Sequence, residues 1–141
     1  MKSMLKVGSI AAISLLIASV AVAQVPPQLT LKQIMNAMIT PATNTIWGAY
    51  QLETEAQWQT IENAALTVIA AGNLMALGGS APGESELAQQ AQWRQFNEQM
   101  IAAAREVLVA VAARDEEALS AAGNNALYPP CESCHQQYQQ R

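Results

Sequence analysis

The sequence predicts an all-α protein folded as an antiparallel four-helix bundle, and three observations support this prediction. Apolar residues recur at spacings of three and four in four successive segments, which is the period of an amphipathic helix. No segment alternates between apolar and polar residues as a half-buried strand does. The connections between segments are short, which favours antiparallel packing of successive helices. An open helical array is the alternative that this pattern leaves in place.

Residues 1–23 have the form of a secretory signal peptide. Lys2 and Lys6 give a basic start, an apolar stretch follows, and Ala21-Val22-Ala23 is an A-x-A cleavage site. We therefore expect cleavage after Ala23, export to the periplasm of a Gram-negative bacterium, and one mature domain over residues 24–141. The alternative is a membrane anchor, for which the apolar run is short.

Cleavage would leave an acidic domain. Without Lys2 and Lys6, five basic and all eleven acidic residues remain, a net charge of −6. The sequence contains no basic patch, which argues against nucleic acid or an anionic membrane surface as a partner. No later segment is apolar enough over sufficient length to cross a bilayer, so we expect no membrane span after cleavage.

The first helical segment covers residues 29–53, with Thr30 as its expected N-cap. Pro41 lies inside the helical pattern, where it removes a backbone donor and disfavours helical geometry at Thr40. We therefore expect a kink or a break at Thr40. The apolar stripe of this segment consists of Leu31, Ile34, Met35, Met38, Ala42, Ile46 and Ala49.

The second and third segments have clear apolar stripes. The second runs from about Thr54 to Leu77 and ends at the GGSAPG sequence of residues 78–83, because paired glycines and a proline terminate helices. The third begins at Ser85. The expected stripes are Trp58, Ile61, Ala65, Val68, Gly72 and Met75 in the second, and Trp93, Phe96, Met100, Ala103, Val107 and Val111 in the third.

The fourth segment begins at Asp115, an expected N-cap followed by two acidic residues that complement the helix dipole. Pro129 and Pro130 interrupt its pattern. We therefore predict two helical pieces, the second of which starts at Pro130 and carries CESCHQQY.

The only two cysteines and the only histidine of the chain lie within five positions, at Cys131, Cys134 and His135. Cys-x-x-Cys-His is the attachment motif of c-type haem. Two thiols at this spacing add to the two vinyl groups of the porphyrin, and the adjacent imidazole reaches the iron. The motif therefore predicts a covalently bound haem c.

Three other interpretations compete with haem attachment. A local disulfide fits an oxidising compartment but leaves the histidine unexplained. A thioredoxin-like redox pair belongs at a helix N-terminus after a strand, and the sequence predicts no strand. A structural zinc site needs four ligands, and the chain has no other cysteine or histidine.

A C-terminal CxxCH that closes a four-helix bundle resembles the class II c-type cytochromes, the cytochrome c′-like family. QIMNAMITPATNTIW also resembles the first helix of an exported subgroup, and the likeness extends from about Leu29 to the end. It implies that Cys131 and Cys134 form the thioethers and that His135 is the proximal iron ligand. Tyr138 matches an aromatic that often follows the motif.

Two positions depart from the family pattern. Gln139 follows the aromatic, where the family often has a basic residue, and the nearest basic residue here is Arg141. Pro129 and Pro130 precede the motif, where family members usually have continuous helix.

The sixth iron position determines the function. With one histidine in the chain, ligation by two histidines is impossible. The resemblance places the distal residue on the first helix, where Met35 is the best match and Met38 the second. A methionine ligand suits electron transfer, whereas an apolar side chain leaves the iron open to small gases. Either methionine is alternatively a core residue.

These observations predict a periplasmic, monohaem electron carrier rather than an enzyme, since no second histidine is present for acid–base chemistry. Its redox partner would offer a basic docking surface to the acidic domain. The alternative functions are a five-coordinate haem protein that binds nitric oxide or carbon monoxide, and a haem-free helical protein with one disulfide. Both monomer and homodimer are compatible with the sequence.

Overall fold

The structure, a computed structural model, describes residues 25–139, of which 78% are helical. Within these residues there is no strand, so the all-α prediction is confirmed. The signal peptide predicted for residues 1–23 lies outside the described residues. None of the helices between residues 25 and 139 has the length and apolar character that a bilayer span requires.

The first helix is continuous across its proline. It consists of α1 (Leu31–Ile34), the π-helix η1 (Met35–Ile39) and α2 (Thr40–Trp47). The predicted break at Thr40 is wrong, because Thr40 is helical with φ −58° and ψ −51°, and its N–H donates to the carbonyl of Met35, five residues back. Pro41 therefore falls in the first turn of a new α-helical stretch, where a missing donor costs little. Thr30 caps the helix as expected.

The second helix, α3 (Glu55–Ala76), confirms the sequence pattern closely. Thr54 caps it and exchanges two hydrogen bonds with Gln57 in a capping box. All six residues of the predicted stripe are buried. A segment with a different periodicity would have exposed part of this stripe, so the burial of all six residues confirms the predicted helical period.

The third segment differs from the prediction at its start. A short helix, α4 (Glu84–Ala88), is separated from the long helix α5 (Ala91–Ala113) by an extended residue, Gln90. Phe96 is only half-buried, and Asn97 occupies the core position beside it.

The last helix is also continuous across its prolines. It consists of α6 (Glu116–Ala121), the π-helix η2 (Ala122–Leu127) and α7 (Tyr128–Tyr138). The predicted interruption before the cysteine motif is wrong, because Leu127 and Tyr128 are both helical. As in the first helix, a π-helix ends two residues before the first proline, so the missing donors fall in the first turn of the next α-helical stretch.

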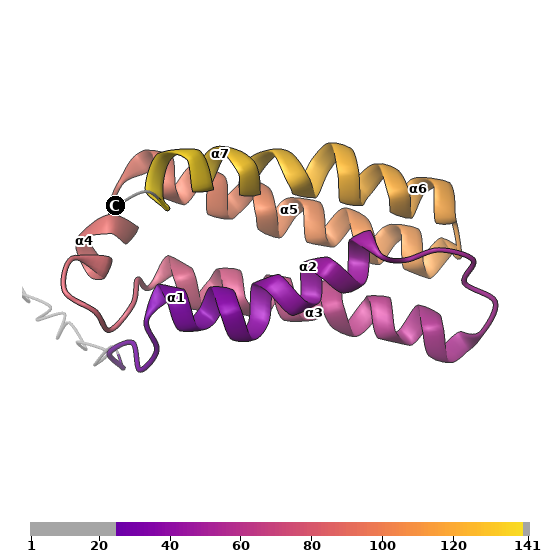
Figure 1. The fold of residues 1–141 in the computed structure, drawn as a ribbon, viewed down its shortest axis with the longest axis horizontal. Helices are drawn as coiled ribbons and strands as arrows, with labels where there is room; N and C mark the ends of the chain where they lie inside the picture. Colours follow the sequence, from indigo (N-terminus) through magenta and orange to yellow (C-terminus); the bar gives the residue numbers. More distant parts are fainter. Residues whose placement is uncertain (1–24, 140–141) are drawn as a thin grey trace, which may run out of the picture.

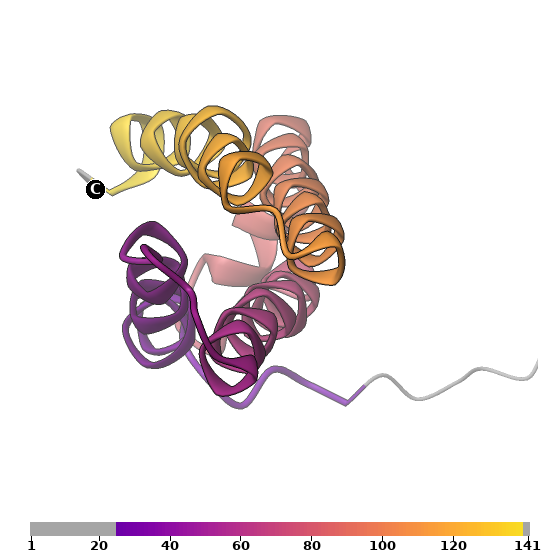
Figure 2. The same ribbon diagram turned by 90° about the vertical axis from the view of Figure 1, so that its right-hand side faces the viewer.

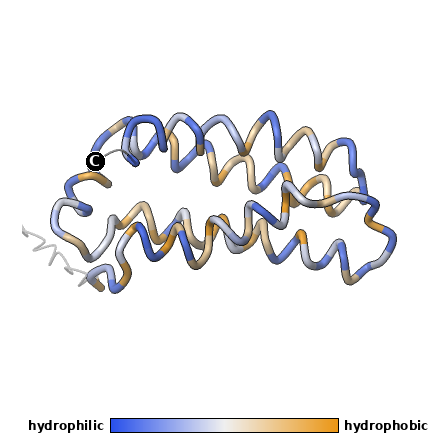
Figure 3. Tube along the Cα trace, in the orientation of Figure 1, coloured by the Kyte–Doolittle hydropathy of each residue, from blue (hydrophilic) through white to orange (hydrophobic). Residues whose placement is uncertain are grey.

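The helices pack around one apolar core (Figures 1 and 2). The long helix α5 contacts α3 on one side and η2, α6 and α7 on the other, while α2 packs on α3. Each helix carries both hydrophobic and hydrophilic residues, as expected for amphipathic helices (Figure 3). The first and last helices meet through α2 and η2, whereas α1 and η1 do not pack extensively on α7.

Candidate haem-attachment site

The cysteine motif lies on α7, directly after its two prolines. Cys131 and Cys134 are half-buried free thiols that pack against the core, while His135 is exposed. A spacing of three places both cysteines on one side of the helix, and the histidine follows on the neighbouring side. The three predicted residues are therefore brought together on a regular helical turn.

Burial changes the acidity of both thiols. It raises the pKa of Cys131 from 9.0 to about 11, with a further contribution from the nearby Cys134. Burial alone raises the pKa of Cys134 to about 11. Both thiols therefore lose their protons only at a higher pH than an exposed cysteine, because burial disfavours the charged thiolate.

Aromatic contacts fix both ends of α7. The ring of Tyr138 meets Trp93 edge to face, with centroids 5.3 Å apart, and its hydroxyl donates to Gln90 Oε1 at 3.2 Å. The ring of Tyr128 meets Trp47 in the same manner at 6.0 Å. The motif therefore lies between two anchored points, which limits how far α7 can shift against α5.

The methionines divide into two groups. Met75 and Met100 are 2% and 4% exposed and belong to the core. Met35 and Met38 are half-buried on η1 and pack against the core from its edge. Of the four, the two that the sequence favours as distal ligands are therefore the two that are not fully enclosed.

The structure does not bring the two halves of the predicted site into direct packing. Met35 and Met38 lie on the first helix and the cysteines on the last, and these helices touch mainly through α2 and η2. Two thiols and an imidazole within one helical turn are the donor set that a covalently attached haem uses, so the residues present fit this group.

Two π-helices frame this arrangement. One carries Met35 and Met38, and the other leads into α7. Single π turns inside α-helices are rare and are frequent at functional sites.

A surface groove of about 520 Å³ lies elsewhere, between α5 and the last helix. Ser133, Pro129 and Pro130 line it together with Phe96, but neither cysteine does. The groove is therefore on a different side of α7 from the thiols and does not belong to the candidate site.

No metal centre built from protein ligands alone accompanies the motif. Over residues 25–139, no group of three or more His, Cys, Asp or Glu side chains is placed to hold an ion. The zinc interpretation therefore lacks a donor set in the described chain.

Sequence reasoning missed one buried polar residue. Asn97 donates from Nδ2 to the carbonyl of Gly72 at 2.9 Å, and its Oδ1 atom has no hydrogen-bond partner among the described residues. Its position four residues after Trp93 was the available signal, because residues four apart share one face of a helix.

Comparisons of the chain with known protein families, with curated proteins and with solved structures gave no match.

Proposed function

We propose that the protein is an exported, monohaem c-type cytochrome similar to the class II cytochromes, and that it carries single electrons rather than catalysing a reaction. The observation that carries this proposal is the CxxCH motif on α7, with both thiols packed against the apolar core. A disulfide does not account for the histidine that follows, and a structural zinc site would lack its fourth cysteine or histidine ligand.

The fold that belongs to this proposal is an antiparallel four-helix bundle with the attachment motif at its C-terminal end. Its support is the order of packing, in which α2 contacts α3, α3 contacts α5, and α5 contacts the last helix. The chain reverses at alternate ends of the molecule in Figure 1, as such a bundle requires.

In this proposal the chain holds haem c through residues of α7 and the first helix. Cys131 and Cys134 provide the two thioether links, His135 Nε2 is the proximal ligand, and Met35 is the distal ligand, with Met38 as second choice. Bound haem supplies one-electron chemistry at its iron. Trp47 and Trp93, each paired with a tyrosine of α7, restrain the helix that carries the imidazole.

The electron-carrier function depends on a methionine ligand. A thioether opposite an imidazole stabilises the reduced state, and a six-coordinate iron transfers electrons with little rearrangement. The half-buried positions of Met35 and Met38 support this function, because such side chains can turn from the core edge without unfolding it.

The packing of Met35 and Met38 on the core also favours a second function. Met35 and Met38 also pack on the core, and a methionine retained there would leave the iron five-coordinate. The protein would then bind nitric oxide or carbon monoxide.

A net charge of −6 after cleavage suits a redox partner with a basic docking surface in the periplasm, and not nucleic acid.

The test is expression of the full chain together with the cytochrome c maturation machinery. We expect an exported, coloured protein, cleaved after Ala23, whose mass exceeds that of the polypeptide by one haem. Cys131→Ala and Cys134→Ala should each lose one thioether, whereas Ser133→Ala, which changes the same helical turn, should retain both. A colourless product with its two sulfurs joined to each other contradicts the proposal.

An optical spectrum distinguishes the two functions. Sharp low-spin bands that do not respond to carbon monoxide in the reduced protein indicate the carrier. A broad Soret band that shifts with carbon monoxide indicates the gas-binding protein.

A further inference from the structure

A carboxylate at the start of α4 reaches the N-terminal end of the first helix. Glu84 Oε2 accepts hydrogen bonds from the backbone N–H groups of Leu31 and Ala81, both at 3.1 Å. Leu31 is the first residue of α1, where backbone donors have no partner inside the helix. Because Glu84 and Leu31 are 53 positions apart, this contact fixes the placement of the helix and not only its local geometry.

The loop between α3 and α4 is shaped to admit this carboxylate. A Cβ atom added to Gly79 would overlap Glu84 Oε2 and lie 2.8 Å from the Leu31 nitrogen. Gly78 has a φ of +84°, and a Cβ there would lie 2.7 Å from the carbonyl oxygen of Glu84. The loop and the start of the first helix therefore form one closely packed unit.

A second link joins the same two segments. The backbone N–H of Ser80 donates to the carbonyl oxygen of Leu29 at 3.0 Å. The chain at Leu29 and Leu31 is thus tied to the 78–84 loop, and the Glu84 carboxylate is the central contact of this connection.

The loop that follows the first helix is held in a similar way. Glu116, at the start of α6, accepts from the backbone N–H groups of Gln51 at 3.1 Å and Leu52 at 2.6 Å. The chain is therefore fixed before and after the first helix, while η1 within this helix does not pack extensively on α7.

These contacts lead to a specific role for Glu84 at the iron site. We propose that Glu84 is a positioning residue that fixes Leu31 and thereby fixes Met35, one helical turn further on, relative to Cys131 and Cys134. The axial distance from Leu31 to Met35 is only about 6 Å, so movement at the first residue is transmitted directly to the fifth. The role at the iron rests on the proposed haem function, whereas the anchoring contact does not.

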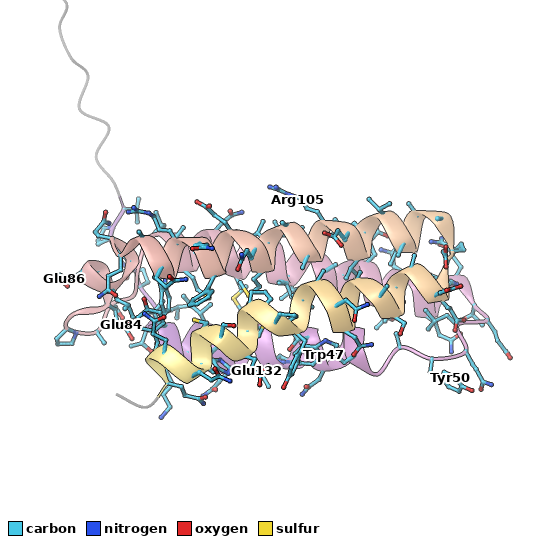
Figure 4. All side chains as sticks on the ribbon, turned by 90° about the horizontal axis from the view of Figure 1, so that it is seen from above. Trp47, Tyr50, Glu84, Glu86, Arg105 and Glu132 are labelled. Atoms are coloured by element: carbon cyan, nitrogen blue, oxygen red, sulfur yellow. The ribbon has the colours of Figure 1, made fainter. Side chains whose placement is uncertain are left out.

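A general electrostatic effect of the acidic turn is the competing explanation, and α4 contains a control for it. Glu86 lies in the same first turn as Glu84 but is exposed. In Figure 4, Glu86 projects outward at the end of the molecule, whereas Glu84 lies closer to its body. Removing Glu86 changes the charge of the turn by the same amount without touching Leu31.

The experiment compares Glu84→Ala, Glu84→Gln and Glu86→Ala in the full mature chain loaded with haem. Two quantities are measured: amide hydrogen exchange at Leu31 and Ala81, and the Soret spectrum of the reduced protein with and without carbon monoxide. We expect Glu84→Ala to speed exchange at Leu31 on the order of tenfold, because a hydrogen bond to a charged acceptor is lost. The Soret band of Glu84→Ala should shift on addition of carbon monoxide, because Met35 is then held less firmly at the iron, whereas the original protein should show no shift.

Glu84→Gln keeps one acceptor oxygen and should fall between the original protein and Glu84→Ala, which preserves the test if the alanine variant does not fold. Glu86→Ala should match the original protein in both measurements. Unchanged exchange at Leu31, or equal effects of Glu84→Ala and Glu86→Ala, overturns the proposal.

Faster exchange in Glu84→Ala without a Soret shift under carbon monoxide also overturns it, because Glu84 would then anchor the helix without positioning Met35; the haem function would stand. A chain that binds no haem contradicts the proposed function itself and removes the role of Glu84 at the iron. In that case, faster exchange at Leu31 still identifies the anchoring contact.

Discussion

The indole Nε1–H of Trp47 donates a hydrogen bond to the carbonyl oxygen of Gly123 at 2.9 Å. This bond joins the end of the first helix to the π-helix that precedes α7. Gly123 permits the close approach, because an added Cβ would lie 3.3 Å from Trp47 Cδ1. It is the best-defined connection between the two helices that would enclose the haem.

We expect Trp47→Phe to lower the free energy of unfolding by about 1 to 2 kcal/mol, since it removes the donor and leaves a partly buried carbonyl unpaired. Chemical denaturation measures this change. Tyr128→Phe is the matched control, because it keeps both the hydrogen bond and the ring that packs on Trp47, and it should leave the free energy of unfolding nearly unchanged. Equal losses in the two variants would contradict a specific contribution of the hydrogen bond.

The identity of the distal ligand is tested by substitutions that keep volume. Met35→Leu should make the reduced protein reactive with carbon monoxide and should change stability by less than about 1.5 kcal/mol. Met38→Leu should leave the spectrum unchanged. The reverse result would assign the ligand to Met38, and a carbon monoxide response in the original protein would favour the gas-binding function.

The two thiols should react slowly in the haem-free chain. With pKa values near 11, Cys131 and Cys134 should be alkylated at pH 8 roughly a hundredfold more slowly than a thiol of ordinary pKa 9.0. The reaction rate should rise with pH up to about 11. Mass spectrometry of the quenched reaction gives the rates, and a short peptide containing CESCH is the unfolded reference; identical rates in the two would contradict burial of the thiols.

The same shifts make stability depend on pH in one direction. The unfolded chain releases the thiol protons near pH 9, whereas the folded chain retains them until about pH 11. The haem-free protein should therefore lose stability as pH rises through this window, and the loss should be modest because the thiols are only partly buried. Denaturation midpoints of the double variant Cys131→Ala/Cys134→Ala should not show this dependence.

The contact between α3 and α5 at Gly72 leaves no room for a side chain. A Cβ there would lie 2.5 Å and 2.8 Å from two side-chain carbons of Ile101. Gly72→Ala should therefore lower the free energy of unfolding by about 1 to 3 kcal/mol. The double variant Gly72→Ala/Ile101→Ala should lose less than the sum of the single variants in denaturation experiments, because the second change provides the space; strict additivity would contradict the close contact.

The helical segments were predictable because burial follows the helix period. The stripe of α3 from Trp58 to Met75 is buried throughout, and Thr30 and Asp115 cap helices as their sequence positions predict. The prolines misled the prediction, because the rule for Pro41 or Pro130 assumes an α-helix on both sides. A π-helix before each proline changes the hydrogen-bond pattern and lets the helix continue.

For the candidate site, the sequence identified the motif but did not predict the contacts that surround it. Spacing alone identifies Cys131, Cys134 and His135 as one group. That both thiols face the core while the imidazole is exposed depends on how α7 packs on α5, which local sequence does not determine. The sequence did not predict the contact of Glu84 with Leu31 either, because this contact joins residues far apart in the chain.

The π-helix before α7 has a consequence for insertions and deletions. A π turn holds one residue more than the α turn it replaces, so it sets the angular phase of all later side chains. Deleting Asn124 would therefore convert the π turn into an α turn and leave the phase of α7 unchanged. Deleting a second residue of this stretch would rotate α7 by about 100° about its axis. The thiols would then turn away from the interior although the motif itself is intact. The ability of the motif to hold a haem therefore depends on the number of residues in the helix that precedes it.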